Sequence, residues 1–171
     1  MDLVLRELTP ADEAAFFEAL SAWDDPSFPF ALDFKPGMSF QDYLVHLAKV
    51  RDGRDLPAHY VPGTMLYGFL GQKIVGRLSL RHRLNEFLLR AGGHIGYGVL
   101  PEYRRRGLAT EMLKLSLPLA RSLGIERCLL ICDDDNIASR KTIERCGGVL
   151  ENVTIESDTE KLIRRYWIEL K

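Results

Sequence analysis

The chain of 171 residues has few cysteines, and their spacing matches no known framework. Cys128, Cys132 and Cys146 are an odd number with no Cys-x-x-Cys pair, which supports neither a disulfide framework nor a cysteine-based zinc site. We interpret them as reduced, small apolar side chains. The histidines also lack the spacing of a metal site, so we expect no metal: they are His46, His59, His82 and His94.

The chain also lacks a strong net charge and long apolar runs. It has 23 basic and 24 acidic side chains, and its formal net charge of -1 argues against a general nucleic-acid binder. No apolar run approaches the roughly 20 residues of a membrane helix. The first residues have neither the basic nor the apolar region of a signal peptide. We therefore expect a cytoplasmic protein that binds neither nucleic acid nor membrane.

Nothing divides the chain into separate parts. Apolar residues make up 46% and charged residues 27%, which is typical of one globular core. No linker or internal repeat is present, so we predict a single domain over residues 1–171. Hydrophobic periodicity predicts its elements. We expect strands at 3–8, 64–70, 73–80, 94–99, 128–132, 149–155 and 161–170, and helices after Thr9 and Ser39 and at 108–123 and 137–146.

Local signals place the first two helices and the connection between them. Thr9 with Asp12, and Ser39 with Asp42, have the spacing of helix-capping boxes. The segment 24–37 between these helices is rich in proline, glycine and phenylalanine. Exposed phenylalanines would be costly, so we expect it either to pack on the core or to line an acceptor pocket.

The predicted helix at 108–123 combines an apolar stripe with a helix breaker. Pro118 removes one backbone hydrogen bond and is expected to kink or shorten the helix. Gly124 is expected to end it. The predicted stripe consists of Leu108, Met112, Leu115, Leu119 and Leu123.

A basic turn containing a glycine joins the strand at 94–99 to this helix. The first amides of a helix lack partners within the helix and lie at the positive end of its dipole. Gly107 lets the backbone close around an anion, and Arg104, Arg105 and Arg106 add positive charge. The sequence therefore predicts a phosphate-binding turn at this place.

Two other phosphate loops are excluded. The turn contains no Gly-Lys-Ser/Thr, and Gly96-Tyr97-Gly98 lacks the third glycine of a dinucleotide fingerprint. Gly96 and Gly98 fall on one face of the strand, which predicts either a bulge or the close approach of another backbone or of a ligand. The remaining pattern at 104–109 is Arg-x-x-Gly-x-Ala.

A second motif follows the predicted strand at 128–132. It reads Asn136-Ile137-Ala138-Ser139, followed by Glu144 and Gly147. The two motifs together resemble those of the GCN5-related N-acetyltransferase (GNAT) family. With Tyr97, Pro101 and Glu111, they are most similar to the branch that contains the ribosomal-protein alanine acetyltransferases. The likeness covers nearly the whole chain.

The resemblance implies an α/β (α+β) GNAT fold. Such a fold has a mixed central sheet of about seven strands with helices on both faces, and the fourth and fifth strands splay apart beyond a bulge near Gly98. It also implies that acetyl-CoA lies in the splay. The cofactor-binding residues implied are Val99, Leu100, Arg104, Arg105, Arg106, Gly107, Leu108, Ala109, Thr110, Asn136 and Ser139.

By the same resemblance, the protein is an N-acyltransferase. The acetyl group would move to a primary amine by direct attack, without a covalent enzyme intermediate. The acceptor is either a small-molecule amine or a protein N-terminus. The oligomeric state is either a monomer or a homodimer. Two alternatives remain: a catalytically inactive acyl-CoA sensor, and a small interaction domain whose basic turn binds an acidic partner.

The chain departs from the family pattern at residues that matter for catalysis. Ile143 occupies the position where many members have a tyrosine as general acid, and Gly148 replaces a customary phenylalanine. The second change predicts a packing gap that another aromatic side chain fills. Ser139 is a candidate proton donor to the departing thiolate, but it also suits a capping or cofactor-contact role.

Three residues are candidates for removing the proton from the attacking amine. His94 stands where the nearest branch has a carboxylate, and the near-neutral pKa of an imidazole suits a base, although a strand histidine also suits a structural role. Glu86 and Asp133 are the other candidates. The acidic run that begins at Asp133 fails the calcium-loop spacing, and we expect it to favour a cationic acceptor.

Overall fold

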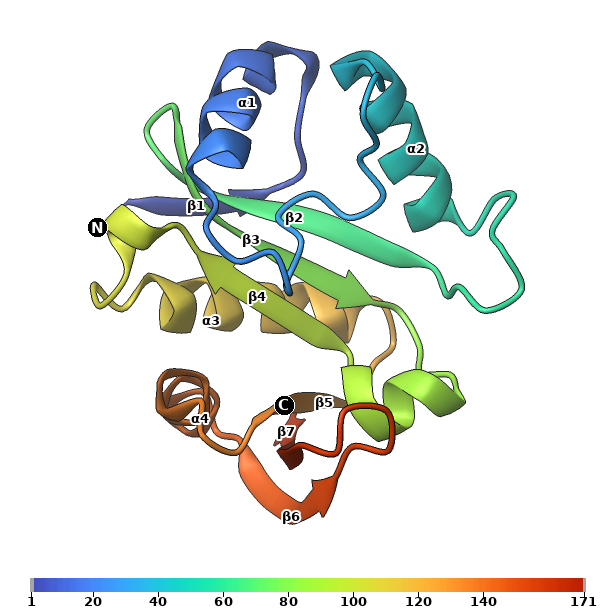
Figure 1. Ribbon diagram of the computed structural model, residues 1–171, viewed down its shortest axis with the longest axis vertical. Helices are drawn as coiled ribbons and strands as arrows, with labels where there is room; N and C mark the ends of the chain where they lie inside the picture. Colours follow the sequence, from blue (N-terminus) through green and yellow to red (C-terminus); the bar gives the residue numbers. More distant parts are fainter. Residues whose placement is uncertain (1, 171) are drawn as a thin grey trace.

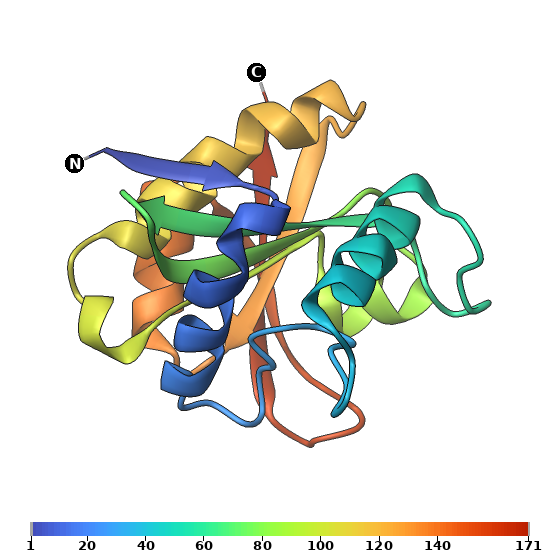
Figure 2. The ribbon, with the colours of Figure 1, turned by 90° about the horizontal axis from the view of Figure 1, so that it is seen from above.

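Seven strands form two antiparallel sheets in the computed structural model, which describes residues 2–170 (Figure 1). The first sheet has the order β1 (Leu3–Arg6), β2 (Gly63–Leu70), β3 (Lys73–Arg81), β4 (Ile95–Val99). The second has the order β5 (Arg127–Asp133), β7 (Leu162–Glu169), β6 (Val149–Ile155). Figure 2 shows β5 and β7 running across the direction of the first sheet.

Helices cover both faces of the first sheet, as expected. The long helices are α1 (Glu13–Ala22), α2 (Phe40–Asp52), α3 (Leu108–Ser122) and α4 (Ile137–Arg145). The helices α1 and α2 pack on one face, while α3 packs on the other and contacts α4 (Figure 1). Short helices are η1 (Pro10–Asp12), η2 (Leu88–Gly92) and η3 (Pro101–Tyr103). No helix within residues 2–170 is long and apolar enough to cross a membrane.

Both predicted capping boxes are present. The backbone amide of Thr9 donates to the Asp12 carboxylate at 2.7 Å, and Arg6 holds the same carboxylate with two hydrogen bonds of 2.7 and 2.8 Å. The amide of Asp42 donates to Ser39 Oγ at 3.0 Å. These contacts fix the starts of η1, which leads into α1, and of α2.

The expectation that Pro118 shortens α3 is wrong, since α3 continues to Ser122, and the kink stays a prediction. Pro118 faces solvent, where water can bond the carbonyl that lacks its helical donor. The predicted stripe is also partly wrong, because Leu115 is 41% exposed and Leu123 is 40% exposed. In the second half of α3, the small side chains of Ser116 and Ala120 are buried instead. The buried residues of α3 are Leu108, Met112, Leu113, Ser116 and Ala120.

The predicted bulge near Gly98 is absent from the β3–β4 ladder, whose register runs without a shift from Leu80↔Ile95 to Gly76↔Val99. The alternative, close approach, is what the structure shows. A Cβ atom on Gly98 would lie 2.5 Å from the Trp23 ring and 3.3 Å from the Phe28 ring. The start of the segment 24–37 therefore packs directly on the β4 backbone.

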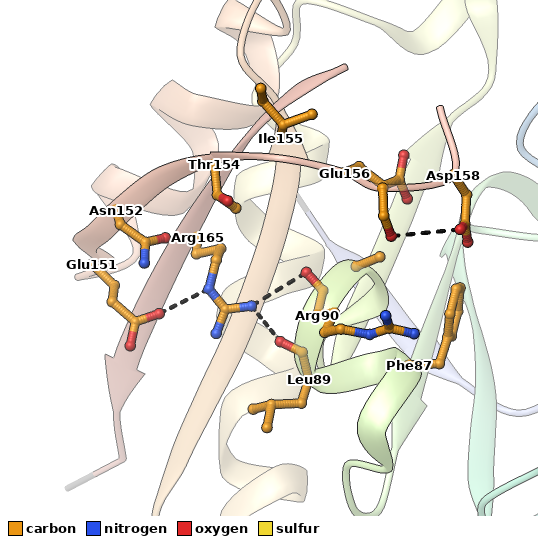
Figure 3. Close-up of a pocket in the computed structure, with 12 residues that line it drawn as sticks. Phe87, Leu89, Arg90, Glu151, Asn152, Thr154, Ile155, Glu156, Asp158 and Arg165 are labelled. Atoms are coloured by element: carbon orange, nitrogen blue, oxygen red, sulfur yellow. Dashed lines mark hydrogen bonds and ion pairs between the residues drawn. The ribbon is translucent and has the colours of Figure 1, made fainter. Parts of the chain in front are cut away.

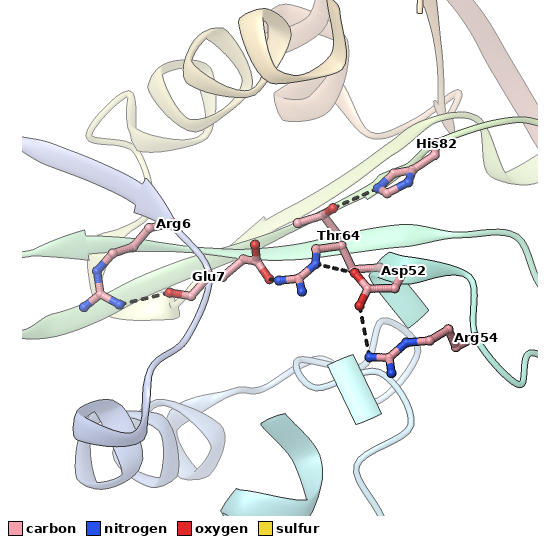
Figure 4. Close-up of polar contacts among 7 residues, drawn as sticks. Arg6, Glu7, Asp52, Arg54, Thr64 and His82 are labelled. Atoms are coloured by element: carbon pink, nitrogen blue, oxygen red, sulfur yellow. Dashed lines mark hydrogen bonds and ion pairs between the residues drawn. The ribbon is translucent and has the colours of Figure 1, made fainter. Parts of the chain in front are cut away.

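A row of polar contacts ties α2 to the first sheet (Figure 4). Arg51 on α2 donates to Glu7 at 2.8 Å, directly after β1, and to its neighbour Asp52 at 3.0 Å. Thr64 on β2 and His82 beyond β3 lie 2.8 Å apart, Oγ1 to Nε2. The pairs are partly exposed, so they position the elements more than they stabilise them.

The Arg6–Asp12 pair gives a test of stability. Because the hydrogen bonds from Arg6 lower the pKa of Asp12 to about 2, its carboxylate stabilises the fold above pH 4. We expect Asp12→Asn to lower the free energy of unfolding by about 2 kcal/mol at pH 7. The difference from wild type should disappear as the pH falls from about 4 towards 2, measured by urea unfolding.

Asp42→Asn is the matched control, because Asp42 belongs to an exposed capping box without an arginine. Its loss should stay below about 1 kcal/mol. Equal losses in the two variants would show that the Arg6 contact adds nothing.

Candidate active site

Within residues 2–170, backbone hydrogen bonding joins the two sheets at one residue pair, where β4 and β5 begin to diverge. The amide of His94 donates to the Leu129 carbonyl at 2.7 Å, and the Leu129 amide donates to His94 Nδ1 at 2.9 Å. From there β4 continues towards Val99 and β5 towards Asp133. No ladder joins β4 and β5 among residues 2–170. The expected splay between the fourth and fifth strands is confirmed, and we call this region the β4–β5 split.

His94 lies at the closed end of the split and is buried, with 7% of its surface exposed. Burial and, to a lesser extent, the positive charge of Arg81 lower the pKa of His94 to about 4. The imidazole is therefore neutral at pH 7, and its Nδ1 lone pair is occupied by the Leu129 amide. This geometry suits a structural contact. The role of His94 as a base stays a prediction.

Tyr97 and Ser139 meet across the split. The Tyr97 hydroxyl lies 2.9 Å from Ser139 Oγ, and either oxygen can donate. Burial raises the pKa of Tyr97 well above its ordinary value, so the phenol keeps its proton. Asn136 caps α4, because its side chain accepts the Ser139 amide at 3.0 Å. The sequence motif thus builds a helix start that presents Ser139 to Tyr97.

The backbone of β4 presents free groups towards the split. Hydrogen bonding alternates along an antiparallel ladder. The amide of Leu100 donates to the Val75 carbonyl of β3 at 2.9 Å, so Leu100 and, by alternation, Gly98 bond towards β3. Tyr97 and Val99 therefore point their main-chain groups away from β3. Of the two predicted contact residues, Val99 has its amide available and Leu100 does not.

The turn before α3 has the shape that its sequence predicts. Gly107 adopts φ +78° directly before the first helical residue, and a Cβ there would meet nothing within 4 Å. No side chain caps α3, so the amides of Leu108, Ala109 and Thr110 are left for another partner. Arg105 also has a positive φ of 61°. Alternating left- and right-handed residues of this kind aim successive amides at one point.

The three arginines of the turn have different surroundings. Arg104 pairs with Asp24 through hydrogen bonds of 2.5 and 3.1 Å, and its Nε donates to the Val99 carbonyl at 3.0 Å. The sequence pattern gave no sign of this contact, which fastens the segment 24–37 to the end of β4. Arg105 and Arg106 are exposed and leave their charge at the mouth of the turn.

The two departures from the family pattern lie against each other. Ile143 is 1% exposed, and a Cβ on Gly148 would lie 2.3 Å from its Cγ2. An aliphatic side chain therefore occupies the space beside Gly148, where we expected an aromatic one. Ile143 points into the core and has no polar atom, so the acid role of the usual tyrosine has no substitute at that position.

Within residues 2–170, neither of the other two catalytic candidates forms a hydrogen bond with Tyr97 or Ser139. Glu86 is exposed in the connection between β3 and η2. Asp133 ends β5 and pairs with Lys161 Nζ at 3.6 Å. Their roles as bases stay predictions. Within residues 2–170, no His, Cys, Asp and Glu side chains are grouped as metal ligands.

A pocket of about 530 Å³ lies between η2 and the β6–β7 hairpin, beyond the closed end of the split (Figure 3). Arg165 of β7 crosses it, donating to Glu151 at 2.9 Å and to the carbonyls of Leu89 and Arg90. Because η2 leads into β4, Arg165 is a second tie between the sheets. None of the predicted site residues lines this pocket.

The comparisons with known proteins agree with this architecture. The family model described as an acetyltransferase (GNAT) domain matches residues 2–149. The chain therefore belongs to the GNAT family of acetyltransferases. A comparison of the sequence with curated proteins gave no significant match.

Solved structures of GNAT proteins share the fold at low identity. A GNAT acetyltransferase from Streptococcus pneumoniae has 18% identity and a TM-score of 0.66, over 99% of this chain and 100% of that one. RimL, a ribosomal L7/L12 alpha-N-protein acetyltransferase in complex with coenzyme A, has 19% identity and a TM-score of 0.66, over 98% of this chain and 94% of that one. The Salmonella typhimurium protein yncA, a putative acetyltransferase with its cofactor acetyl-CoA, has 14% identity and a TM-score of 0.60, over 100% of this chain and 95% of that one.

The buried imidazole predicts a pH dependence of stability. The pKa of His94 is lower in the fold than in the unfolded chain, so protonation favours unfolding. Its contribution is complete above about pH 6.5 and is lost as the pH falls towards 4, by about 3 kcal/mol. His94→Gln removes the titrating group, and the unfolding free energy of wild type relative to this variant should fall over that range.

The exposed His59 provides the control. His59→Gln should leave the pH profile of unfolding unchanged. A profile for His94→Gln that parallels wild type from pH 7 to 4 would contradict the buried, neutral state of His94.

Proposed function

We propose that the protein transfers the acetyl group of acetyl-CoA to a primary amine by direct attack. The observation that carries this proposal is the β4–β5 split, which opens beside unpaired helix amides at Gly107. Membership of the GNAT family supports acetyl-CoA as donor. RimL, whose named acceptor is a protein N-terminus, supports an amine as acceptor class.

The residues present fit the cofactor. Gly107 leaves open space where a side chain would stand, and the amides of 108–110 face that space without a cap. A diphosphate supplies the negative charge that such a helix start attracts. The outward main-chain groups of Tyr97 would bond the pantetheine arm in the manner of an added strand, with Val99 beside them. When bound, acetyl-CoA supplies the acetyl group as an activated thioester.

The chain's own groups then account for the transfer. The outward amide of Val99 would stabilise the negative charge that develops on the acetyl oxygen. The Tyr97–Ser139 pair would donate a proton to the departing thiolate, because both hydroxyls remain protonated at neutral pH. Tyr97 on β4 thereby takes the acid role that Ile143 on α4 cannot perform. The attacking amine must arrive neutral, and His94, Glu86 and Asp133 remain the candidates for its proton.

The cradle at Gly107 gives a test of cofactor binding. Gly107→Glu adds bulk and a negative charge at the proposed diphosphate position. We expect it to weaken coenzyme A binding at least about 100-fold, measured by isothermal titration calorimetry.

Gly124→Glu is a closely matched control. Gly124 has a φ of +82° and open space around its Cβ position, as Gly107 does, but it follows the other end of α3. Its affinity for coenzyme A should remain within about twofold of wild type. Unchanged affinity for coenzyme A in Gly107→Glu would refute the proposed diphosphate site at Gly107.

The hydroxyl pair gives a test of the chemistry. We expect Tyr97→Phe and Ser139→Ala each to lower kcat about 10- to 100-fold, because each removes a member of the proton-donating pair. Free coenzyme A released with a panel of primary amines measures the rate. Ser122→Ala, at an exposed hydroxyl on α3, should have no effect.

The same assay separates an enzyme from an acyl-CoA sensor. A sensor would bind coenzyme A but release none with any amine. The loss of Tyr97 as an acid would then be irrelevant, and the two variants would behave as wild type.

A further inference from the structure

A second pocket lies on the face of the first sheet that α1 and α2 cover. Its volume is about 310 Å³, and its lining comes from α2, β2, β3, the end of the 24–37 segment and the connection before β2. Ser79 lines it from β3 and donates to the Gly96 carbonyl at 3.3 Å, so one strand separates this pocket from the β4–β5 split. None of the residues assigned to acetyl transfer lines it.

One carboxylate in this pocket is held in a fixed position. Asp33 Oδ1 accepts the Tyr60 hydroxyl at 2.8 Å, and Oδ2 lies 3.1 Å from His46 Nε2, which donates in the neutral tautomer with its proton there. The His46 ring stacks on the ring of Tyr43, which is fully buried. Two distant parts of the chain, α2 and the connection before β2, thus converge on Asp33.

The backbone at Asp33 is strained. Its φ of +63° lies in the left-handed region, which costs energy for any residue except glycine. Asparagine and aspartate tolerate that region best, but nothing about a simple loop requires a carboxylate there. Strain of this kind persists where surrounding contacts enforce it, and it is concentrated at ligand sites.

The Asp33 carboxylate has unused acceptor positions. The Asp33 side chain is 30% exposed, and His46 is the one basic side chain within 4 Å of its carboxylate among residues 2–170. A carboxylate has about four acceptor positions, and Tyr60 and His46 use two of them. Asp33 therefore retains two acceptor positions.

The other charged group of the pocket is less available. Arg81 lines it from the end of β3, and its Nη1 already donates to the carbonyls of Gly92 and Gly93 at 3.2 and 3.4 Å. These bonds direct the Arg81 guanidinium towards η2 and the start of β4, whereas the two unused acceptor positions of Asp33 are open to a cation. The balance favours a positively charged ligand.

We propose that this pocket binds a small organic cation whose charged group bonds to Asp33 and whose apolar body lies between α2 and the sheet. Most of the lining is apolar, with a few convergent polar groups, which is typical of a small-molecule site. The aliphatic and phenylalanine side chains of the lining are Leu32, Leu47, Val50, Val61, Met65, Leu80, Phe87 and Leu88. The proposal does not depend on the acetyl transfer argued above.

Binding of 2-phenylethylamine, a cation at pH 7, tests the proposal by titration calorimetry. Its counterpart 3-phenylpropionate has a similar body and the opposite charge. Asp33→Asn keeps a residue that tolerates the left-handed backbone and keeps acceptor and donor atoms for Tyr60 and His46, but it removes the charge. We expect this variant to bind the amine about 10- to 100-fold more weakly.

Asp55→Asn is the matched control, since Asp55 also has a positive φ, of 54°, and is exposed outside the pocket. It should bind the amine within twofold of wild type. Tyr60→Phe, which removes one hydrogen bond to Asp33, should cause a smaller loss. Amide chemical shifts in wild type should change near Asp33 and His46, and not along β4.

Three results would overturn the proposal: no binding of the amine by wild type, equal binding by Asp33→Asn, or tighter binding of 3-phenylpropionate. The affinity of Asp33→Asn for coenzyme A should equal that of wild type. Failure of wild type to bind coenzyme A would refute the proposed transferase while leaving this pocket untouched, so the two failures are distinguishable.

Discussion

The contact between His94 and Leu129 is the constraint on which the rest of the site depends. Two sheets that cross can pair only over a short stretch, because their strands separate as the twist accumulates. Here that stretch is a single residue pair, with one backbone bond and one bond to a buried imidazole. Beyond it, β4 turns the main-chain groups of Tyr97 and Val99 towards the split, where Arg104 bonds the Val99 carbonyl. An apolar residue at position 94 would leave the Leu129 amide buried without an acceptor, so histidine is used as a structural acceptor.

The open end of the split is organised by Arg104. Its guanidinium spans from the last carbonyl of β4 to Asp24, so one side chain connects the turn before α3 to the segment that covers Gly98. The rings of Trp23 and Phe28 can pack on β4 only because residue 98 is a glycine. A side chain at position 98 would displace both rings from the strand. Arg104 therefore connects the segment that packs on β4, through Asp24, to the turn that precedes α3.

Much of this architecture is predictable from particular residues. Thr9, Ser39, Gly71 and Gly107 specify local backbone conformations, and each lies where its local rule places it. The errors concern interactions between distant segments. The predicted apolar stripe of α3 was partly wrong, because the burial of Ser116 in place of Leu115 depends on which face of the helix meets the sheet. The Arg104–Asp24 pair and the Asp33–Tyr60–His46 cluster join residues far apart in sequence, and no local pattern encodes such pairings.

The same distinction explains how catalysis can survive the loss of the usual tyrosine. What a departing thiolate requires is a protonated hydroxyl at a point in space, whichever element provides it. In this chain the α4 position is occupied by Ile143, which packs against Gly148 and completes the core. The nearby hydroxyls come from Tyr97 on β4 and from Ser139 in the first turn of α4, and they meet across the split. Isoleucine fills the space under α4, while Tyr97, kept protonated by burial, lies on the opposite wall, where the proposed mechanism assigns it the acid role.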